Sequence, residues 1–254
     1  MKNMKTQPVT KLNPGDVAPY CLLPGSPERA EWMTTFLDES KLVSNYRGLV
    51  GYKGVKDGIP ISIISTGMGA LSESFVAEEC INLGAHTLIR VGSCGWIQTH
   101  IKTGDINIVT GAVRDDGLTD RLIPPSYPAI ADISVVQALI NAAEEINHPY
   151  HVGLCLTGAA WYGIDTSQFE RIWRPANVNV FENEASALLV IASLRGVRAG
   201  AIVAVDDEAG SVSALNLQIE GAEMFKKGVE AEIKIAIKAL VALGKDDLKK
   251  EKNE

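Results

Sequence analysis

The segment TLIRVGSCG, residues 87–95, carries the strongest local pattern in the chain. Its first part, Thr87–Val91, is a short apolar and β-branched run of the kind that forms a buried strand. Arg90 stands near the end of this run, and burying its charge is costly unless an anion or a carboxylate pairs with it. The small residues Gly92–Gly95 then allow a ligand to approach closely. The segment predicts a strand that ends at an anion site, with a structural salt bridge as the alternative.

Similar apolar runs recur along the chain, and helical patterns separate them. Apolar residues three and four positions apart predict helices at 76–83, 136–143, 185–192 and 229–240. Short runs alternating with helices favour a sheet covered by helices, which is the α/β class. The further candidate strands are Ala18–Leu23, Ile61–Ser65, Asp105–Val109, His151–Leu156 and Arg198–Val205.

The length of 254 residues fits one large α/β domain or two small ones. No internal repeat and no Pro/Gly/Ser-rich linker divides the chain, so we expect one domain over residues 1–244. The last ten residues, 245–254, read KDDLKKEKNE. This segment is too polar to pack against a core, and we expect a charged, disordered tail.

Charge and composition exclude several classes of protein. The chain has 31 acidic and 24 basic residues, a net charge of −7, and no basic run outside its end, which argues against nucleic acid as a partner. No apolar run approaches the roughly 18 residues of a membrane span, and the polar start lacks the apolar core of a signal peptide. We therefore expect a cytoplasmic protein. Four widely spaced cysteines predict reduced thiols and no metal site: Cys21, Cys80, Cys94 and Cys155.

Two glycine-containing turns stand between a candidate strand and a helix. In the first, 24–29, Ser26 can cap a helix that begins at Pro27, and the helix N-terminus together with Arg29 can bind an anion. An ordinary strand-to-helix connection is the alternative. The second turn, 65–70, has two glycines but lacks the third glycine of a dinucleotide fingerprint, so we exclude nicotinamide binding. The second turn is therefore either a substrate loop or a tight turn that packs the helix on the sheet.

Two acidic clusters follow apolar stretches. Glu182 and Glu184 flank Asn183 at the start of a helix, where they either complement the helix dipole or accept hydrogen bonds from the vicinal hydroxyls of a sugar. Asp206 and Asp207 end an apolar strand, at the sheet edge where open α/β proteins bind ligands. Adjacent carboxylates in a partly dry site raise each other's pKa, so one of them can serve as a general acid. A solvated acidic turn is the alternative.

Taken in this order, the segments resemble the nucleoside phosphorylase family, which includes bacterial uridine phosphorylase and hexameric purine nucleoside phosphorylase. The resemblance runs from Leu22 to Leu243. It implies a single-domain three-layer sandwich with a central mixed β-sheet flanked by helices. It also implies reversible phosphorolysis of a nucleoside to free base and ribose 1-phosphate, without a metal or an organic cofactor. The matching motifs are Pro24-Gly25-x-Pro27-x-Arg29, Ser65-Thr66-Gly67-x-Gly69, Arg90-x-Gly92-Ser93-x-Gly95 and Glu182-x-Glu184-Ala185.

The family's functional residues map onto this chain motif by motif. The resemblance assigns phosphate binding to Gly25, Arg29, Arg90 and Ser93, with Arg47 reaching into a neighbouring subunit's site. Sharing Arg47 implies a homo-oligomer, in this family a hexamer built as a trimer of dimers. The residues implied to contact the nucleoside are Cys94, Gly95, Trp161, Glu182, Asn183 and Glu184.

The base preference depends on two further positions. Purine enzymes of this family carry an aspartate at the end of the strand occupied here by 203–207, which gapless placement matches to Asp207, with Asp206 as the alternative. Uridine phosphorylases carry a Gln-x-Arg pair after the aromatic motif, and the segment 163–170 has none. The resemblance therefore favours purine nucleosides, with uridine phosphorylase as the alternative.

Four departures from the family pattern keep other functions open. Ser26 replaces the usual aspartate, Ala159 replaces an expected acid, and the N-terminal histidine and the arginine that supports the purine-site acid have no counterparts. A nucleosidase, which uses water, and a nucleoside-binding member without catalysis are therefore alternatives. The presence of Arg29 and Arg90 argues against a nucleosidase, because water does not require them.

Overall fold

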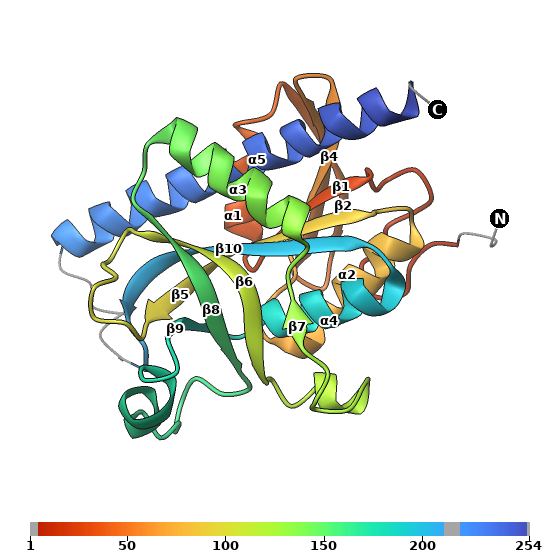
Figure 1. Ribbon diagram of the computed structural model, residues 1–254. Helices are drawn as coiled ribbons and strands as arrows, with labels where there is room; N and C mark the ends of the chain where they lie inside the picture. Colours follow the sequence, from red (N-terminus) through yellow and green to blue (C-terminus); the bar gives the residue numbers. More distant parts are fainter. Residues whose placement is uncertain (1–4, 211–218, 253–254) are drawn as a thin grey trace.

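The computed structural model describes residues 5–210 and 219–252, in which one ten-stranded mixed sheet is covered by helices (Figure 1). The strand order is β10-β6-β8-β9-β5-β1-β4-β3-β2, and β7 pairs with β6. The strands are β1 (Tyr20–Pro24), β2 (Glu39–Tyr46), β3 (Leu49–Lys56), β4 (Ile59–Ile64), β5 (Thr87–Trp96), β6 (Ile106–Asp115), β7 (Ala129–Ile130), β8 (Tyr150–Gly158), β9 (Val178–Glu182) and β10 (Arg198–Glu208).

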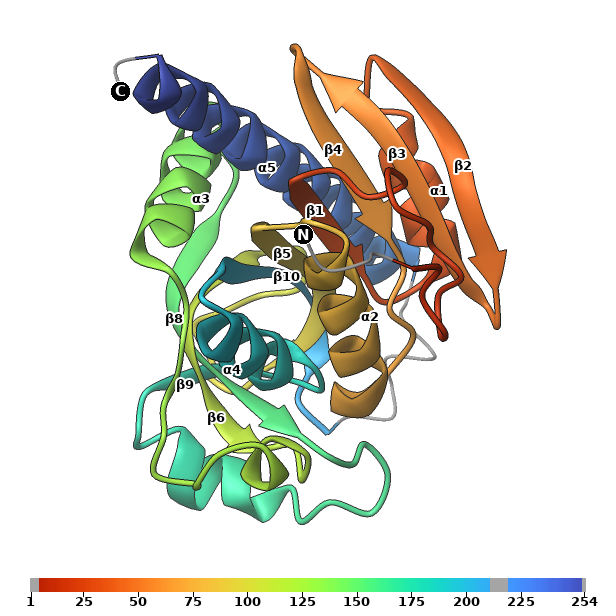
Figure 2. The ribbon, with the colours of Figure 1, turned by 90° about the vertical axis from the view of Figure 1, so that its right-hand side faces the viewer.

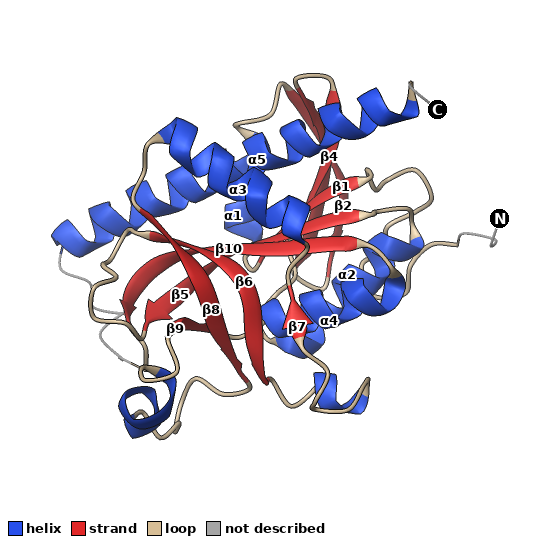
Figure 3. Cartoon of the chain, in the orientation of Figure 1, coloured by secondary structure: helices blue, strands red, loops and turns tan. Residues whose placement is uncertain are grey.

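Five α-helices pack on this sheet within the described residues (Figure 3). They are α1 (Pro27–Thr34), α2 (Ala70–Asn82), α3 (Ile133–Ile146), α4 (Ala185–Arg195) and α5 (Ile219–Glu251). Short turns of 3-10 helix and π-helix occupy Thr119–Arg121 and Phe169–Trp173. Across the described part of the chain, no helix combines the length and the apolarity needed to cross a membrane.

The alternation of side chains along β1 shows the three layers. Cys21 and Leu23 belong to the apolar cluster that α2 and α4 complete, whereas Tyr20 and Leu22 belong to the cluster completed by α1, α3 and α5. Because successive side chains of a strand point to opposite faces, a strand buried on both faces requires helices on both. Figure 2 shows α2 and α4 on one side of the central strands and α5 on the other. The predicted single-domain three-layer sandwich is confirmed.

The central strand β5 is twice as long as predicted and changes partners along its length. Its first residues pair in parallel with β1 and β10, and its last two, Gly95 and Trp96, pair antiparallel with β9. Since β9 pairs with β8, β8 with β6, and β6 with β10, five strands close into a ring. The glycines of the predicted turn therefore continue the strand, and this closure brings β9 beside the end of β5.

The hairpin β2–β3 and strand β9 were not among the predicted strands. Most side chains of β2 are exposed, so the segment lacks the apolar run by which a buried strand is predicted. Its structure depends on pairing with β3 through a tight turn at Arg47 and Gly48, which have φ angles of 55° and 76°. Pairing between strands, not local apolar pattern, forms this edge of the sheet.

The predicted disordered tail is wrong for residues 245–251, because α5 continues through Glu251. Asp247 accepts a hydrogen bond from the Tyr20 hydroxyl at 2.8 Å and from Nη1 of Arg198 at 3.1 Å. Lys245 forms an ion pair with Asp57 at 3.3 Å. Charged side chains thus hold this part of the helix on the sheet, where apolar packing alone would not.

We expect Asp247→Asn to lower the free energy of unfolding by about 1–2 kcal/mol near neutral pH. Burial opposes the charged form, but hydrogen bonds from Arg198 and Tyr20 keep the pKa of Asp247 below its usual value. Its stabilisation is therefore present above the unfolded pKa of about 4 and is lost as the pH falls through the folded pKa. Urea denaturation of both proteins at several pH values measures the difference.

The matched control is Asp246→Asn, because Asp246 pairs with Lys249 on the exposed surface of the same helix. We expect this change to cost less than about 0.5 kcal/mol. Equal losses in the two variants would contradict the role of Asp247 in holding the end of α5.

Candidate active site

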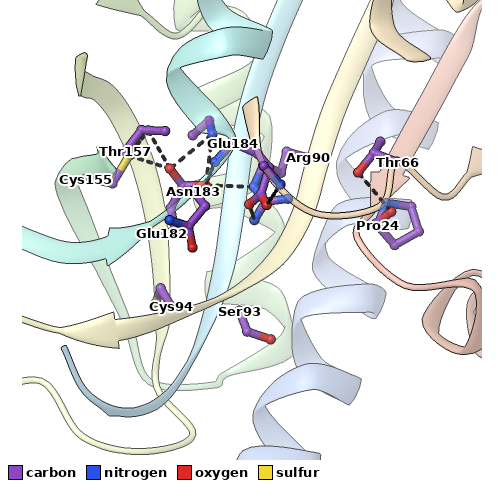
Figure 4. A network of polar contacts seen from close by, with 12 residues as sticks. Pro24, Thr66, Arg90, Ser93, Cys94, Cys155, Thr157, Glu182, Asn183 and Glu184 are labelled. Atoms are coloured by element: carbon purple, nitrogen blue, oxygen red, sulfur yellow. Dashed lines mark hydrogen bonds and ion pairs between the residues drawn. The ribbon is translucent and has the colours of Figure 1, made fainter. Parts of the chain in front are cut away.

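The three predicted loops meet at one edge of the sheet. Parallel pairing places β4, β1, β5 and β10 side by side, so their carboxyl ends lie together. The first two loops are joined directly: the backbone N–H of Thr66 donates to the Pro24 carbonyl at 2.9 Å (Figure 4), and that of Gly67 donates to the Gly25 carbonyl at 3.0 Å. This edge of the sheet is where an open α/β protein binds its ligand.

Arg29 lies against the third loop, as expected from the sequence. Ser26 caps α1, and its hydroxyl accepts from the Arg29 backbone N–H at 3.1 Å, which fixes the start of the helix. The guanidinium of Arg29 then extends to β5, where Nη2 donates to Oγ of Ser93 at 2.7 Å and Nη1 lies 3.5 Å from the Val91 carbonyl. Two predicted phosphate-binding side chains are therefore in contact.

Arg90 is 3% exposed and is surrounded by carboxylates (Figure 4). Its Nε donates to Oε2 of Glu182 at 2.9 Å, and its Nη2 forms an ion pair with Glu184. Nη1 has no hydrogen-bond partner within the described residues. The carboxylates compensate the buried charge, which confirms the salt bridge considered from the sequence, and one donor is left for a ligand.

The Glu182 carboxylate is fully occupied by hydrogen bonds from within the protein. Besides Arg90, its carboxylate accepts from the backbone N–H groups of Glu184 at 2.8 Å and Ala185 at 2.9 Å, and from the hydroxyl of Thr157. It is 1% exposed. Its geometry makes Glu182 the residue that positions Arg90 and the first turn of α4, and its expected contact with the nucleoside stays a prediction.

Glu184 connects the second and third loops. One carboxylate oxygen pairs with Arg90, and the other accepts from the backbone N–H of Gly69 at 2.6 Å. Gly69 has a φ angle of 88°, a conformation that glycine adopts without strain, and this directs its N–H at the carboxylate. Between the two glutamates, the side-chain amide of Asn183 donates to the Gly158 carbonyl at 2.7 Å. Glu184 is thus placed at the site by contacts on both sides.

The two aspartates lie where β10 becomes irregular. The register against β5 shifts between Val205 and Glu208, and both aspartates are half-buried there. Burial raises the pKa of Asp206 to about 6, against the opposing effects of the Asp207 backbone N–H and the charge of Arg29. The Asp207 carboxylate accepts from the Glu208 backbone N–H at 2.8 Å.

Three of the residues expected at the nucleoside lie in packed surroundings. Cys94 is 1% exposed, and its thiol donates to the Ala204 carbonyl at 3.6 Å. A Cβ on Gly95 would lie 2.6 Å from Cα of Ala209, so the close approach of two backbones requires glycine there. The Trp161 ring packs 6.0 Å from that of Phe181. Their contact with a nucleoside stays a prediction.

A cavity of about 470 Å³ opens beyond the aspartates, between the ends of β5 and β10 and the segment 166–174. Its size suits a small organic ligand. The lining combines aromatic, polar and charged side chains, including Trp96, Phe169, Thr166, Arg174 and Glu208.

Arg47 lies away from these contacts, exposed in the turn between β2 and β3. Its guanidinium carbon is 5.8 Å from the centre of the Tyr46 ring. Its expected action in a neighbouring subunit stays a prediction.

Sequence reasoning missed two buried acids beside the arginines. Glu73 on α2 is fully buried, and burial raises its pKa to about 8 although Arg90 opposes the shift. Glu232 on α5 is also fully buried, with Oε2 at 3.5 Å from Nη1 of Arg29. Each acid interrupts an apolar helical stripe, Glu73 three residues before Val76 and Glu232 three after Val229. An acid on the apolar face of a helix was the available sign of a buried partner.

Metal-ligating side chains do not gather in the described residues: no group of three or more His, Cys, Asp or Glu there could hold a metal ion. The four cysteines are buried and unpaired. The site's polar groups are thus arginines, carboxylates, hydroxyls and backbone N–H groups.

Two arginines and a hydroxyl lie beside glycine turns with carboxylates next to them, so this α/β fold brings together groups of the kind that bind anions and hydroxyl groups. The sequence model of the Phosphorylase superfamily matches residues 19–242. The chain belongs to this superfamily, and the resemblance found in the sequence and the expected enzyme class, a pentosyltransferase of the nucleoside phosphorylase type, are confirmed.

Characterised relatives include enzymes for both kinds of base. A guanosine phosphorylase of Halorubrum lacusprofundi is 33% identical over 242 residues, covering 94% of this chain and 100% of the relative. A uridine phosphorylase of Thermococcus kodakarensis is 40% identical over 204 residues, covering 76% and 74%.

Solved structures with a similar fold also include both uridine and purine enzymes. Uridine phosphorylase from Vibrio fischeri aligns with a TM-score of 0.87 and 27% identity, over 95% of this chain and 100% of that chain. Purine nucleoside phosphorylase from Toxoplasma gondii, in complex with immucillin-H, aligns with a TM-score of 0.87 and 29% identity, over 97% and 99%. The fold is therefore shared with both purine and uridine enzymes.

We expect Gly92→Ala to lower the free energy of unfolding by about 2–4 kcal/mol. A Cβ there would lie 2.6 Å from Nη2 of Arg90, which the two glutamates hold in place. The guanidinium must move, and its ion pairs must loosen. Gly25→Ala is the control, because its Cβ would meet the Gly67 carbonyl at an ordinary 3.5 Å, and we expect a cost below about 1 kcal/mol. Similar urea midpoints for the two variants would contradict this account.

Proposed function

We propose that the protein is a nucleoside phosphorylase that cleaves the N-glycosidic bond of a nucleoside, with purines preferred, to free base and ribose 1-phosphate. The observation that carries the proposal is the approach of two guanidinium groups to adjacent residues of β5. Arg29 lies 3.5 Å from the Val91 carbonyl, and Arg90 covers Gly92. Inorganic phosphate is the co-substrate, and neither a metal nor an organic cofactor takes part.

The chemistry follows from the charges that develop during cleavage. As the bond between C1′ and the base breaks, its electron pair goes to the base nitrogen and positive charge builds on the ribose ring. A phosphate oxygen then forms the new bond to C1′. Arg29, Arg90 and Ser93 hold the dianion beneath the sugar, and Glu184 accepts hydrogen bonds from the ribose hydroxyls. An aspartate of β10 donates the proton that neutralises the leaving base.

The preference for purines rests on the strand-end acids. Asp206 and Asp207 directly precede Glu208, which lines the cavity at the end of β10, so a base bound there would have an acid close by in the chain to supply a proton. The guanosine phosphorylase relative supports this choice. Uridine phosphorylase is the second candidate, supported by the 40% identity to the Thermococcus kodakarensis enzyme. The contact between Arg29 and Ser93 favours phosphate over water as the nucleophile, and hence phosphorolysis over a nucleosidase reaction.

The assembly and location are further parts of the proposal. Arg47 is exposed at the tip of a hairpin at the edge of the sheet, which suits contact with a neighbour's site. We therefore propose a homo-oligomer, a hexamer arranged as a trimer of dimers. Four buried, unpaired cysteines support a cytoplasmic location.

The decisive experiment is a panel of inosine, guanosine, adenosine, methylthioadenosine and uridine, incubated with and without phosphate. We expect phosphate-dependent release of base and ribose 1-phosphate, faster for a purine nucleoside than for uridine. Chromatography of the products measures both. Faster cleavage of uridine would establish the second candidate, cleavage without phosphate would establish a nucleosidase, and binding without turnover would establish a non-catalytic protein.

Separate substitution of the two aspartates identifies the acid. We expect Asp207→Asn to lower kcat for the purine substrate by about 100-fold, the usual contribution of a general acid. Asp206→Asn should act mainly on the KM for phosphate, because the Asp206 carboxylate interacts electrostatically with Arg29. Steady-state kinetics at saturating nucleoside separates the two effects. If neither variant changes turnover, an acid at the end of β10 has no part in the reaction.

A further inference from the structure

Glu232 is a buried acid that the proposed chemistry does not use. It lies on α5, packed against the central strands, and its side chain is 0% exposed. Oε2 is 3.5 Å from Nη1 of Arg29, and Oε1 has no hydrogen-bond partner within the described residues. Buried carboxylates are normally paired closely or fully hydrogen-bonded, because desolvating the charge is costly. The backbone N–H groups of Gly92 and Ala204 also favour its charged form, but the ion pair that Glu232 forms within the described residues is the 3.5 Å contact with Arg29.

The ion pair between Glu232 and Arg29 is loose. Charge-assisted hydrogen bonds of this type are about 2.7–2.9 Å long, and Arg90 meets Glu182 at 2.9 Å. The short hydrogen bond of Arg29 is instead the one that it donates to Oγ of Ser93, at 2.7 Å. Arg29 is thus aimed at the predicted phosphate position, with a carboxylate behind it that an incoming anion can replace.

The charged groups around Glu232 come from several elements. Arg29 on α1 and Arg90 on β5 favour its charged form. Cys94 on β5 interacts electrostatically with Glu232, and Asp206 on β10 interacts electrostatically with the same Arg29. A phosphate dianion at Ser93 would add two negative charges beside this carboxylate in a region of low dielectric, where like charges repel strongly. Binding of the anion and ionisation of Glu232 therefore oppose each other.

We propose that Glu232 is a positioning residue of the phosphate site: its carboxyl group holds Arg29 toward Ser93, and where this group is ionised it takes up one proton when phosphate binds that guanidinium. The inference rests on the proposed function, because it assigns the anion as phosphate. It explains why the acid is buried beside Arg29 and why it meets Arg29 at a longer distance than Glu182 meets Arg90.

The proposal makes phosphate affinity depend on pH in a defined direction. Burial raises the pKa of Glu232 to about 8, against the charges of Arg29 and Arg90. Below this value the residue already carries the proton and phosphate binds without further uptake. Above it, where inorganic phosphate stays a dianion, each bound phosphate must bring a proton to Glu232. Affinity then falls by up to about tenfold for each pH unit.

Calorimetric titration of inorganic phosphate into the full-length protein tests this without requiring turnover. Measurements near pH 8.5 in two buffers of different ionisation enthalpy give the number of protons taken up. We expect about 0.7 proton per phosphate for the wild type and none for Glu232→Gln. The Kd of Glu232→Gln for phosphate should also stay constant from about pH 8 to 9.5, while that of the wild type weakens. Glu232→Met, of similar volume and without a titrating group, repeats the test if the amide disturbs folding.

The matched control is Glu73→Gln. Glu73 is equally buried, and its pKa is also raised to about 8, but it forms no ion pair with Arg29 or Arg90 within the described residues. Proton uptake should persist in this variant. Uptake that persists in Glu232→Gln, or disappears only in Glu73→Gln, would overturn the inference. If the wild type binds phosphate without proton uptake, only the inference on Glu232 is overturned. If it does not bind phosphate, the proposed function is overturned as well.

Discussion

The buried Arg90 guanidinium is the interaction on which the rest of the site depends. It joins β5 to Glu182 at the end of β9 and to Glu184 at the start of α4. Through Glu182 it fixes the first N–H groups of α4, and through Glu184 it fixes Gly69 at the start of α2. A buried ion network of this kind contributes little net stability compared with apolar packing, but breaking one member leaves uncompensated charges. Its effect is to hold the three loops in one arrangement.

The alternation of side chains along β5 adds a second constraint. Arg90 and Cys94 point toward the layer of α2 and α4, whereas Ser93 points toward α1 and α5 (Figure 4). Two arginines from opposite layers can reach the same ligand only where the strand between them carries no side chain, because a side chain there would fill the space. Gly92 meets this need, since its missing Cβ leaves room for the Arg90 guanidinium. The glycine therefore follows from the position of the buried guanidinium.

The local chemistry of the loops could be predicted from the sequence, because its causes lie within a few residues. The cap formed by Ser26, the helix start at Pro27 and the direction of Arg29 follow from adjacent positions. Partners distant in the chain could not be predicted in the same way. Glu232 lies 203 residues from Arg29, and the sequence shows only an acid on an apolar stripe. The exposed strand β2 was missed for the same reason, since its partner β3, not its own pattern, makes it a strand.

Acids hold the two arginines in different ways, which indicates a structural role for Arg90 and a ligand-binding role for Arg29. Arg90 has two carboxylates within ion-pair distance, both engaged by backbone N–H groups as well, so its position is permanent. Arg29 has one distant carboxylate and a short bond to a hydroxyl, so its charge is available. A net charge of −7 over the whole chain is thus compatible with an anion site at this edge of the sheet. In the proposed function the local field comes from one fixed and one exchangeable cation, and the proton that we propose Glu232 accepts removes the remaining repulsion.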